Sequence, residues 1–249
     1  MKKRLNKLEL EICSNNWRSA RAADQAGADR IELCSALGEG GVTPSAGLIR
    51  QCVNNLSLKI HVLIRARAGD FYYNAEEIEI MKNDVKFCKE QGVDGVVIGF
   101  LTTDGSIDKA LTQEFIELAR PMKITFHRAF DRCQHPLEAL EELIELKVDY
   151  LLSSGQQAKV IDGADLLKEL VIKSRDRIKI MAASGVRMQL LPQLIEKTNA
   201  HAYHLSSRTK ENSEMIYQKT DVNLGDDEYM IDSQEVEVLK KAKEILANS

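Results

Sequence analysis

Short apolar segments alternate about eight times along the chain with longer stretches of helical periodicity. The segments span residues 8–13, 30–34, 59–65, 94–100, 122–127, 148–154, 177–183 and 201–207. Each one is rich in valine, isoleucine, leucine or aromatic residues, which is typical of strands buried on both faces of a parallel sheet. The pattern therefore predicts eight parallel strands joined by helices.

The stretches between these strands predict helices with recognisable ends. Residues 74–92 predict a helix capped by Asn74, with Glu77 three positions further on and Gly92 as a left-handed stop. Thr43 is the expected N-cap of the preceding helix, because Pro44 suits a first helical position.

Eight such units within 249 residues, with no linker between them, predict an α/β chain folded as one (β/α)8 TIM barrel over residues 1–249, with its core at about 8–208. An open doubly wound sheet is the alternative, but no G-x-G-x-x-G motif follows the first strand. The polar residues 210–232 predict an irregular surface excursion and a candidate dimer contact. A last helix is expected over 234–247.

Composition narrows the class of protein. A formal net charge of -4 argues against nucleic acid as the main partner, since phosphate neutralisation needs a basic surface. The chain shows no signal-peptide pattern, and its apolar runs are far shorter than the ~20 residues that cross a bilayer. Five scattered cysteines are an odd number and do not suggest a disulfide framework. These features predict a reduced, cytoplasmic protein without a membrane partner.

Polar and ionisable residues gather where the predicted strands end, which is the face on which barrels of this kind carry their sites. They are Glu11, Cys13, Glu32, Cys34, Arg65, Arg67, Asp70, His127, Arg128, Asp131, Ser153, Ser154, Ser184, Gly185, His204, Ser206, Ser207 and Arg208. A functional pocket is favoured over a structural ring of ion pairs. Because a buried carboxylate needs a partner, Arg65 is the expected counter-charge of Glu11.

Two cysteines occupy matching positions near the ends of the first two strands. Residues two apart share a face of a strand, so Cys13 lies on the side of Glu11, and Cys34 on the side of Glu32. Neighbouring strands lie ~4.8 Å apart, which would bring both thiols within reach of one soft ion such as Cu(I). Cys133 is a weaker third candidate. By spacing alone, simple packing of the thiols is the stronger interpretation.

Histidines and small residues suggest further chemistry at the same ends. His127 and His204 are candidates for general acid or base, and a structural role for each is equally open. His61 opens the third strand and is expected at the opposite, stabilising end of the barrel. Gly185 and Arg208, in the loops after the seventh and eighth strands, suggest an anion site.

Several segments resemble the CutC family, the copper homeostasis proteins of bacteria and animals. They are LEICSNN, GADRIELCSALGEGGVTPS, VLIRARAGDFYYN, VDGVVIGFLTTDGSID, ITFHRAFDRC, LLSSG and HLSSR, between about residues 8 and 208. The resemblance implies a (β/α)8 barrel, a cytoplasmic location, a homodimer and Cu(I) binding. Cys13 and Cys34 match the thiols that are proposed as copper ligands in the family.

Two functions follow from these patterns. The first is copper homeostasis, with Cu(I) held by Cys13 and Cys34. The alternative is an enzyme that uses acid–base chemistry on a small anionic metabolite such as a sugar or sugar phosphate. Its catalytic candidates are Glu11, Glu32, His127 and Asp131. Its binding candidates are Arg65, Arg67, Asp70, Arg128, Ser154, Gly185, His204, Ser206 and Arg208. A purely structural scaffold is the third possibility.

Overall fold

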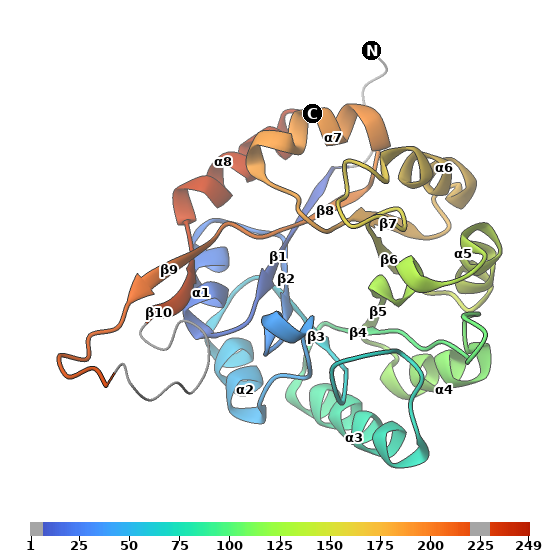
Figure 1. Cartoon of the computed structure of the whole chain (residues 1–249), viewed down its shortest axis with the longest axis horizontal. Coiled ribbons are helices and arrows are strands. Elements are labelled where there is room, and N and C mark those ends of the chain that lie inside the picture. The colour runs from blue at the N-terminus through green and yellow to red at the C-terminus, as the bar shows by residue number, and fades with distance from the viewer. Residues whose placement is uncertain (1–6, 220–229) are drawn as a thin grey trace.

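A computed structural model describes residues 7–219 and 230–249. Eight parallel strands close into a barrel in their order along the chain, and helices surround it (Figure 1). The strands are β1 (Glu9–Ser14), β2 (Arg30–Leu33), β3 (Lys59–Leu63), β4 (Gly95–Ile98), β5 (Lys123–Phe126), β6 (Tyr150–Ser153), β7 (Lys179–Ala182) and β8 (Ala202–Leu205). The predicted (β/α)8 barrel is therefore confirmed.

The outer layer of the barrel consists of helices that follow the strands in turn (Figure 1). They are α1 (Trp17–Gln25), α2 (Ala46–Asn55), α3 (Ala75–Gln91), α4 (Lys109–Ala119), α5 (Pro136–Glu145), α6 (Ala164–Ser174), α7 (Leu191–Thr198) and α8 (Val236–Ala247). Short 3-10 turns lie at Leu37–Glu39, Arg128–Arg132 and Met188–Leu190.

Alternate residues of each strand face either the helices or the barrel interior. Leu10 and Ile12 of β1, and Ile31 and Leu33 of β2, are buried in the main hydrophobic core with the helices. Burial of each such side chain contributes ~1.5–3 kcal/mol to folding. The residues between them are polar or ionisable and point the other way. The main core therefore lies between sheet and helices, and the charged groups share the inside of the barrel.

The helix ends agree with the sequence in one case and differ in another. The Asn74 side chain accepts from the Glu77 amide and the Glu77 carboxylate accepts from the Asn74 amide, so the predicted capping box is confirmed. The expected Thr43 cap is wrong, because Ser45 caps α2. The Thr43 hydroxyl instead accepts from the Arg65 amide at 2.9 Å, which ties the loop after β2 to the end of β3.

The predicted irregular excursion over 210–232 contains regular structure. Strand β9 (Arg208–Asn212) pairs antiparallel with β10 (Met230–Gln234), and the two-stranded sheet projects to one side of the barrel (Figure 1). The side-chain amide of Asn15 donates to the Asp232 carboxylate at 2.8 Å and anchors β10 beside the start of α1. Residues 220–229 of the predicted excursion lie outside the described residues.

Among the described helices, none combines the length and apolar character needed to cross a membrane.

Candidate functional site at the barrel mouth

A cavity of about 330 Å³ lies at the carboxyl ends of the barrel strands. We call it the mouth cavity. The predicted site residues that line it are Cys13, Glu32, Cys34, Arg65, His127, Arg128, Gly185, His204, Ser206 and Arg208. Side chains from nearly every strand end therefore meet around one space, as the barrel topology requires.

A column of alternating charges runs through the barrel interior to the floor of this cavity. At the far end the Lys179 ammonium pairs with Glu9. The Glu9 carboxylate lies 3.3 Å from Nη1 of Arg30, whose Nε donates to the Glu11 carboxylate. The other oxygen of Glu11 lies 2.7 Å from Nδ1 of His204. Each buried charge therefore has an opposite charge beside it.

Strand register explains this column. In the parallel pairing, Glu11 is aligned with Arg30 on β2 and with His204 on β8. Arg30 is only 2% exposed, and its guanidinium also lies over the Tyr150 ring at 4.2 Å from the ring centre. The expected role of Arg65 as the counter-charge of Glu11 is therefore wrong, because Arg30 fills it. Arg30 could have been predicted from the sequence, since it lies two residues before Glu32 in one strand and therefore shares its face.

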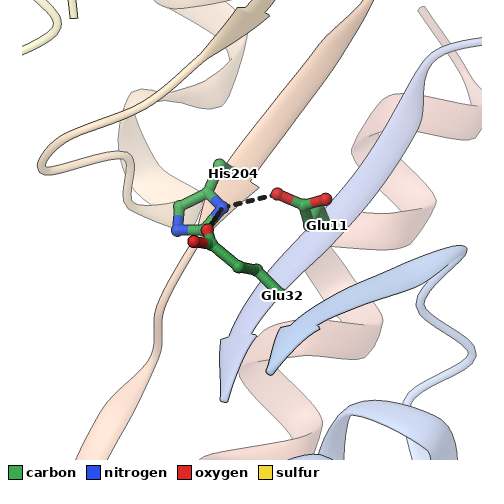
Figure 2. Close-up of side chains that lie close together, drawn as sticks. All are labelled: Glu11, Glu32 and His204. Carbon is green, nitrogen blue, oxygen red and sulfur yellow. Dashed lines mark hydrogen bonds and ion pairs between the residues drawn. The ribbon is translucent and has the colours of Figure 1, made fainter. Parts of the chain in front are cut away.

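Glu11, Glu32 and His204 form a compact cluster at the top of the column (Figure 2). Their ligand atoms lie within 4.8 Å of one another, and Nδ1 of His204 is 3.3 Å from the Glu32 carboxylate. Burial opposes ionisation of Glu11, but Arg30 and His204 hold the pKa of that carboxyl well below its usual range. Two carboxylates and an imidazole at this spacing could bind a cation or transfer a proton.

The other two members of the cluster titrate differently from Glu11. Burial raises the pKa of Glu32 to about 7. The positive charge of His204 opposes this rise, and the negative charge of Glu11 adds to it. Burial disfavours the charged form of His204, but its hydrogen bonds to Cys13 and Glu11 and the charge of Glu32 raise its pKa well above the usual value. The cluster therefore holds one fixed carboxylate, one imidazolium and one carboxyl that can change its charge near neutral pH.

Both predicted thiols lie on the wall of the mouth cavity. Cys13 packs against the small apolar cluster that contains Cys34, and interactions with Cys34 and His204 both affect its pKa. Contact with Cys34 and burial raise the pKa of Cys13 well above its ordinary range. Cys34 is 1% exposed and packs with Leu63 and Val97 in a small apolar cluster inside the barrel. The two sulfur atoms thus share one place beside the carboxylate–imidazole cluster.

His127 lines another part of the same cavity. Its Nδ1 accepts from the Ala129 amide at 3.0 Å, so the neutral ring carries its hydrogen on Nε2. Burial and the nearby Arg65 charge lower the pKa of His127 to about 3. The ring is therefore neutral across the physiological range, and its Nε2 carries a hydrogen that could be donated.

Asp131 and Ser154 lie behind the cavity wall and hold two loops together. The Asp131 carboxylate accepts from the Ser153 hydroxyl at 2.6 Å and from the Ser154 amide at 3.0 Å, and it pairs with Arg128 at 2.7 Å. These contacts join the turn after β5 to the loop after β6. Neither Asp131 nor Ser154 lines the mouth cavity, so the geometry gives both a positioning role.

Arg67 and Asp70 are not brought into the mouth cavity. Their side chains pair with each other at 3.0 Å, and Arg67 also pairs with Glu77 at the start of α3 at 2.6 Å. Asp70 is 69% exposed on the outer surface. The alternation of side chains along a strand could not predict where Arg67 and Asp70 point, because both residues lie in an irregular loop after the end of β3.

The remaining cysteines are apart from the site. Cys133 is hydrogen-bonded to the Gln156 side chain and does not line the cavity, so it is not a third partner of Cys13 and Cys34. Cys52 and Cys88 are fully buried in the main core.

Arg187, like Arg30, was not predicted from the sequence. Arg187 lines the mouth cavity, and its guanidinium donates to the Ser206 carbonyl across the loops after β7 and β8. Arg187 could have been predicted, because it lies two residues after Gly185 in a loop that the sequence already indicated as an anion site.

Buried neutral histidines predict a loss of stability in acid. Burial and the Arg30 charge lower the pKa of His61 to about 3, whereas in the unfolded chain it is 6.5. Stability from neutral His61 is present above pH 6.5 and is lost as pH falls toward 3. Between pH 6.5 and 5 the loss is ~2 kcal/mol.

We therefore expect His61→Gln to lose ~2 kcal/mol less stability than the wild type over this interval. Urea unfolding at pH 8, 6.5 and 5 measures the difference, with pH 8 as the internal reference. Parallel pH curves for the two proteins would show that His61 takes up its proton at the same pH in the folded and unfolded chains, so that burial does not keep it neutral.

A family comparison covers most of this chain. Residues 8–209 match the model of the CutC family. The copper homeostasis protein cutC homolog of Homo sapiens is 40% identical over 216 residues, which cover 87% of this chain and 79% of that protein. A family protein CutC from Parabacteroides distasonis is 44% identical, over 87% of this chain and 89% of its own length.

Solved structures agree with the fold. The crystal structure of the putative copper homeostasis protein CutC from Streptococcus agalactiae superposes with a TM-score of 0.75 at 29% identity, over 79% of this chain and 97% of that one. KGPDC from Streptococcus mutans, at 11% identity and a TM-score of 0.60, covers 98% of this chain and 99% of its own and shares the fold alone. The matched length and the identity to several CutC proteins lead to one conclusion: the chain belongs to the CutC family.

Proposed function

We propose that this protein acts in copper homeostasis by binding Cu(I) through Cys13 and Cys34. The observation that carries the proposal is that these two thiols pack in one apolar cluster and line the mouth cavity together with His204. Its human relative is named a copper homeostasis protein, which agrees with this function.

The donor atoms at this wall fit a soft monovalent ion. Thiolate sulfur selects Cu(I) over hard cations, and an imidazole is a common additional ligand. Cys13 is protonated near neutral pH, since its pKa is raised, so the ion must displace that proton to bind. The apolar neighbours Leu63 and Val97 would exclude water from the metal–sulfur bonds.

A Cys13→Ser/Cys34→Ser double variant is expected to bind Cu(I) at least ~100-fold more weakly than the wild type, because each lost thiolate bond removes several kcal/mol. Anaerobic titration against a calibrated Cu(I) competitor measures the affinity. Cys133→Ser is the matched control, since this thiol lies outside the cavity, and it should bind like the wild type. Equal affinity of the double variant and the wild type would remove the copper proposal.

Two further properties are proposed from family membership. The protein would work in the cytoplasm, which agrees with five free cysteines. It would form a homodimer, as the resemblance to the family implies.

The alternative enzyme is a second candidate, and one observation favours it. Glu32, with its pKa raised to about 7, and the neutral donor His127 line the same cavity. A carboxyl that exchanges protons near neutral pH and a fixed uncharged donor suit proton transfer next to a carbonyl group. This candidate requires that the cavity bind a small anion, and that requirement can be examined by itself.

A further inference from the structure

The mouth cavity has an excess of unpaired positive charge. Four guanidinium groups line it, from Arg65, Arg128, Arg187 and Arg208. Arg128 is neutralised by Asp131 at 2.7 Å. Within residues 7–219 and 230–249, the other three have no carboxylate partner, and Glu32 is the sole acid in the cavity lining.

Two buried nitrogen donors at this cavity also lack a hydrogen-bond partner in the described part of the chain. They are Nε of Arg65 and Nε2 of His127. A buried donor without an acceptor loses its hydration and gains nothing in return, so such groups are usually completed by an ordered water or a ligand. Both orphan donors belong to residues that line the mouth cavity.

Other polar and ring contacts hold both side chains in place. The terminal nitrogens of Arg65 donate to the carbonyls of Gly41 at 2.7 Å and Gly69 at 2.9 Å. Nδ1 of His127 is occupied by the Ala129 amide. The Phe71 ring packs on both groups, 5.1 Å from the Arg65 guanidinium and 4.9 Å from the His127 ring. The two donors are therefore held rigidly at the cavity wall.

We propose that the mouth cavity binds a small organic oxyanion, a carboxylate or a phosphate monoester, that also bears hydroxyl groups. Arg187 and Arg208 hold the charged group at the rim, where planar guanidinium groups suit oxyanions. An oxygen deeper in the ligand accepts from Nε2 of His127 and lies near Arg65, and a hydroxyl donates to Glu32. A volume of about 330 Å³ admits a metabolite of this size and excludes a polymer.

This inference deepens the second candidate function and does not depend on copper. It replaces the binding set predicted from the sequence, since Arg67 and Asp70 pair with each other outside the cavity and Arg187 takes their place. Arg187 and Arg208 have exposed side chains, so substituting them should leave the fold intact.

The test uses isothermal titration calorimetry on metal-free protein with glycerol 3-phosphate, glycerate and uncharged glycerol. We expect at least one of the two anions to bind and glycerol not to bind. The Arg187→Gln/Arg208→Gln variant should bind that anion at least ~tenfold more weakly. Arg18→Gln/Arg50→Gln changes the net charge equally on the outer surface, at residues that do not line the cavity, and should bind like the wild type.

The outcomes separate the possibilities. Tighter binding of glycerol 3-phosphate identifies a phosphate site, and tighter binding of glycerate identifies a carboxylate site; either result supports the proposal. Failure of both anions to bind better than glycerol overturns it, as does equal weakening in the two arginine double variants. The Cys13→Ser/Cys34→Ser variant should keep anion binding, so the failure of one proposal is distinguishable from the failure of the other.

Discussion

Replacing Arg30 with methionine is expected to lower the free energy of unfolding by about 3–5 kcal/mol. The substitution removes the buried guanidinium that pairs with Glu11 and lies 3.3 Å from Glu9. The Glu11 side chain is 1% exposed, so its charge would remain inside the barrel, with His204 as its remaining ion-pair partner among the described residues. Leaving a buried charge without its partner costs far more than the intact pair contributes.

Urea unfolding at pH 7 measures this loss. Arg18→Met is the matched control, because Arg18 pairs with Glu211 where both side chains are almost half exposed, and surface pairs contribute about 0–1 kcal/mol. Adding Glu11→Gln to Arg30→Met should recover part of the stability, since the unpaired charge is then removed. Near wild-type stability of Arg30→Met would mean that water or rearrangement compensates Glu11, and that the charge column is not needed for folding.

The second large effect is expected at Gly155, in the loop after β6. A Cβ at this position would lie 2.1 Å from the Gly163 carbonyl oxygen, and the backbone has a φ of +69°. The obstacle is backbone and cannot move aside as a flexible side chain would. Left-handed strain of about 1–2 kcal/mol adds to overpacking of about 1–3 kcal/mol, so Gly155→Ala should destabilise the protein by about 2–5 kcal/mol.

Gly27→Ala separates the two contributions to this loss. Gly27 has a φ of +71°, but apart from its chain neighbours no atom of the described residues lies within 4 Å of the position of its Cβ, so it should show the strain alone. Chemical unfolding of both variants gives the steric share by difference. A Gly155→Ala variant no less stable than Gly27→Ala would show that the loop can open without cost. It would also contradict the rigid wall that Asp131 and Ser154 build beside the mouth cavity.

The charge column links stability to the chemistry of the site. Arg30 keeps Glu11 ionised, and Glu11 in turn favours the charged form of His204. A negative Glu11 also raises the pKa of Glu32, although burial is the larger cause. Arg30 and Glu11 do not line the mouth cavity, but they therefore control the charges of His204 and Glu32, which do.

Much of this site could be predicted because strands obey a simple rule. Period-two alternation correctly grouped Glu11 with Cys13 and Glu32 with Cys34, and sequential strand order made the two pairs neighbours. The same rule applied one step further would have given Arg30. Loop residues follow no such rule, so the predicted Arg67 lies outside the mouth cavity, and Arg187, which lines it, was not predicted.

The sequence by itself determined the eight-stranded barrel, its family and the face that holds the candidate site, because hydrophobic periodicity and local caps are encoded within short segments. Only the tertiary structure decided which cation neutralises Glu11, which arginines lack a carboxylate partner and which donors of Arg65 and His127 lack an acceptor among the described residues. Those facts depend on distances between side chains of different strands and loops, and such distances exist only once the barrel has closed.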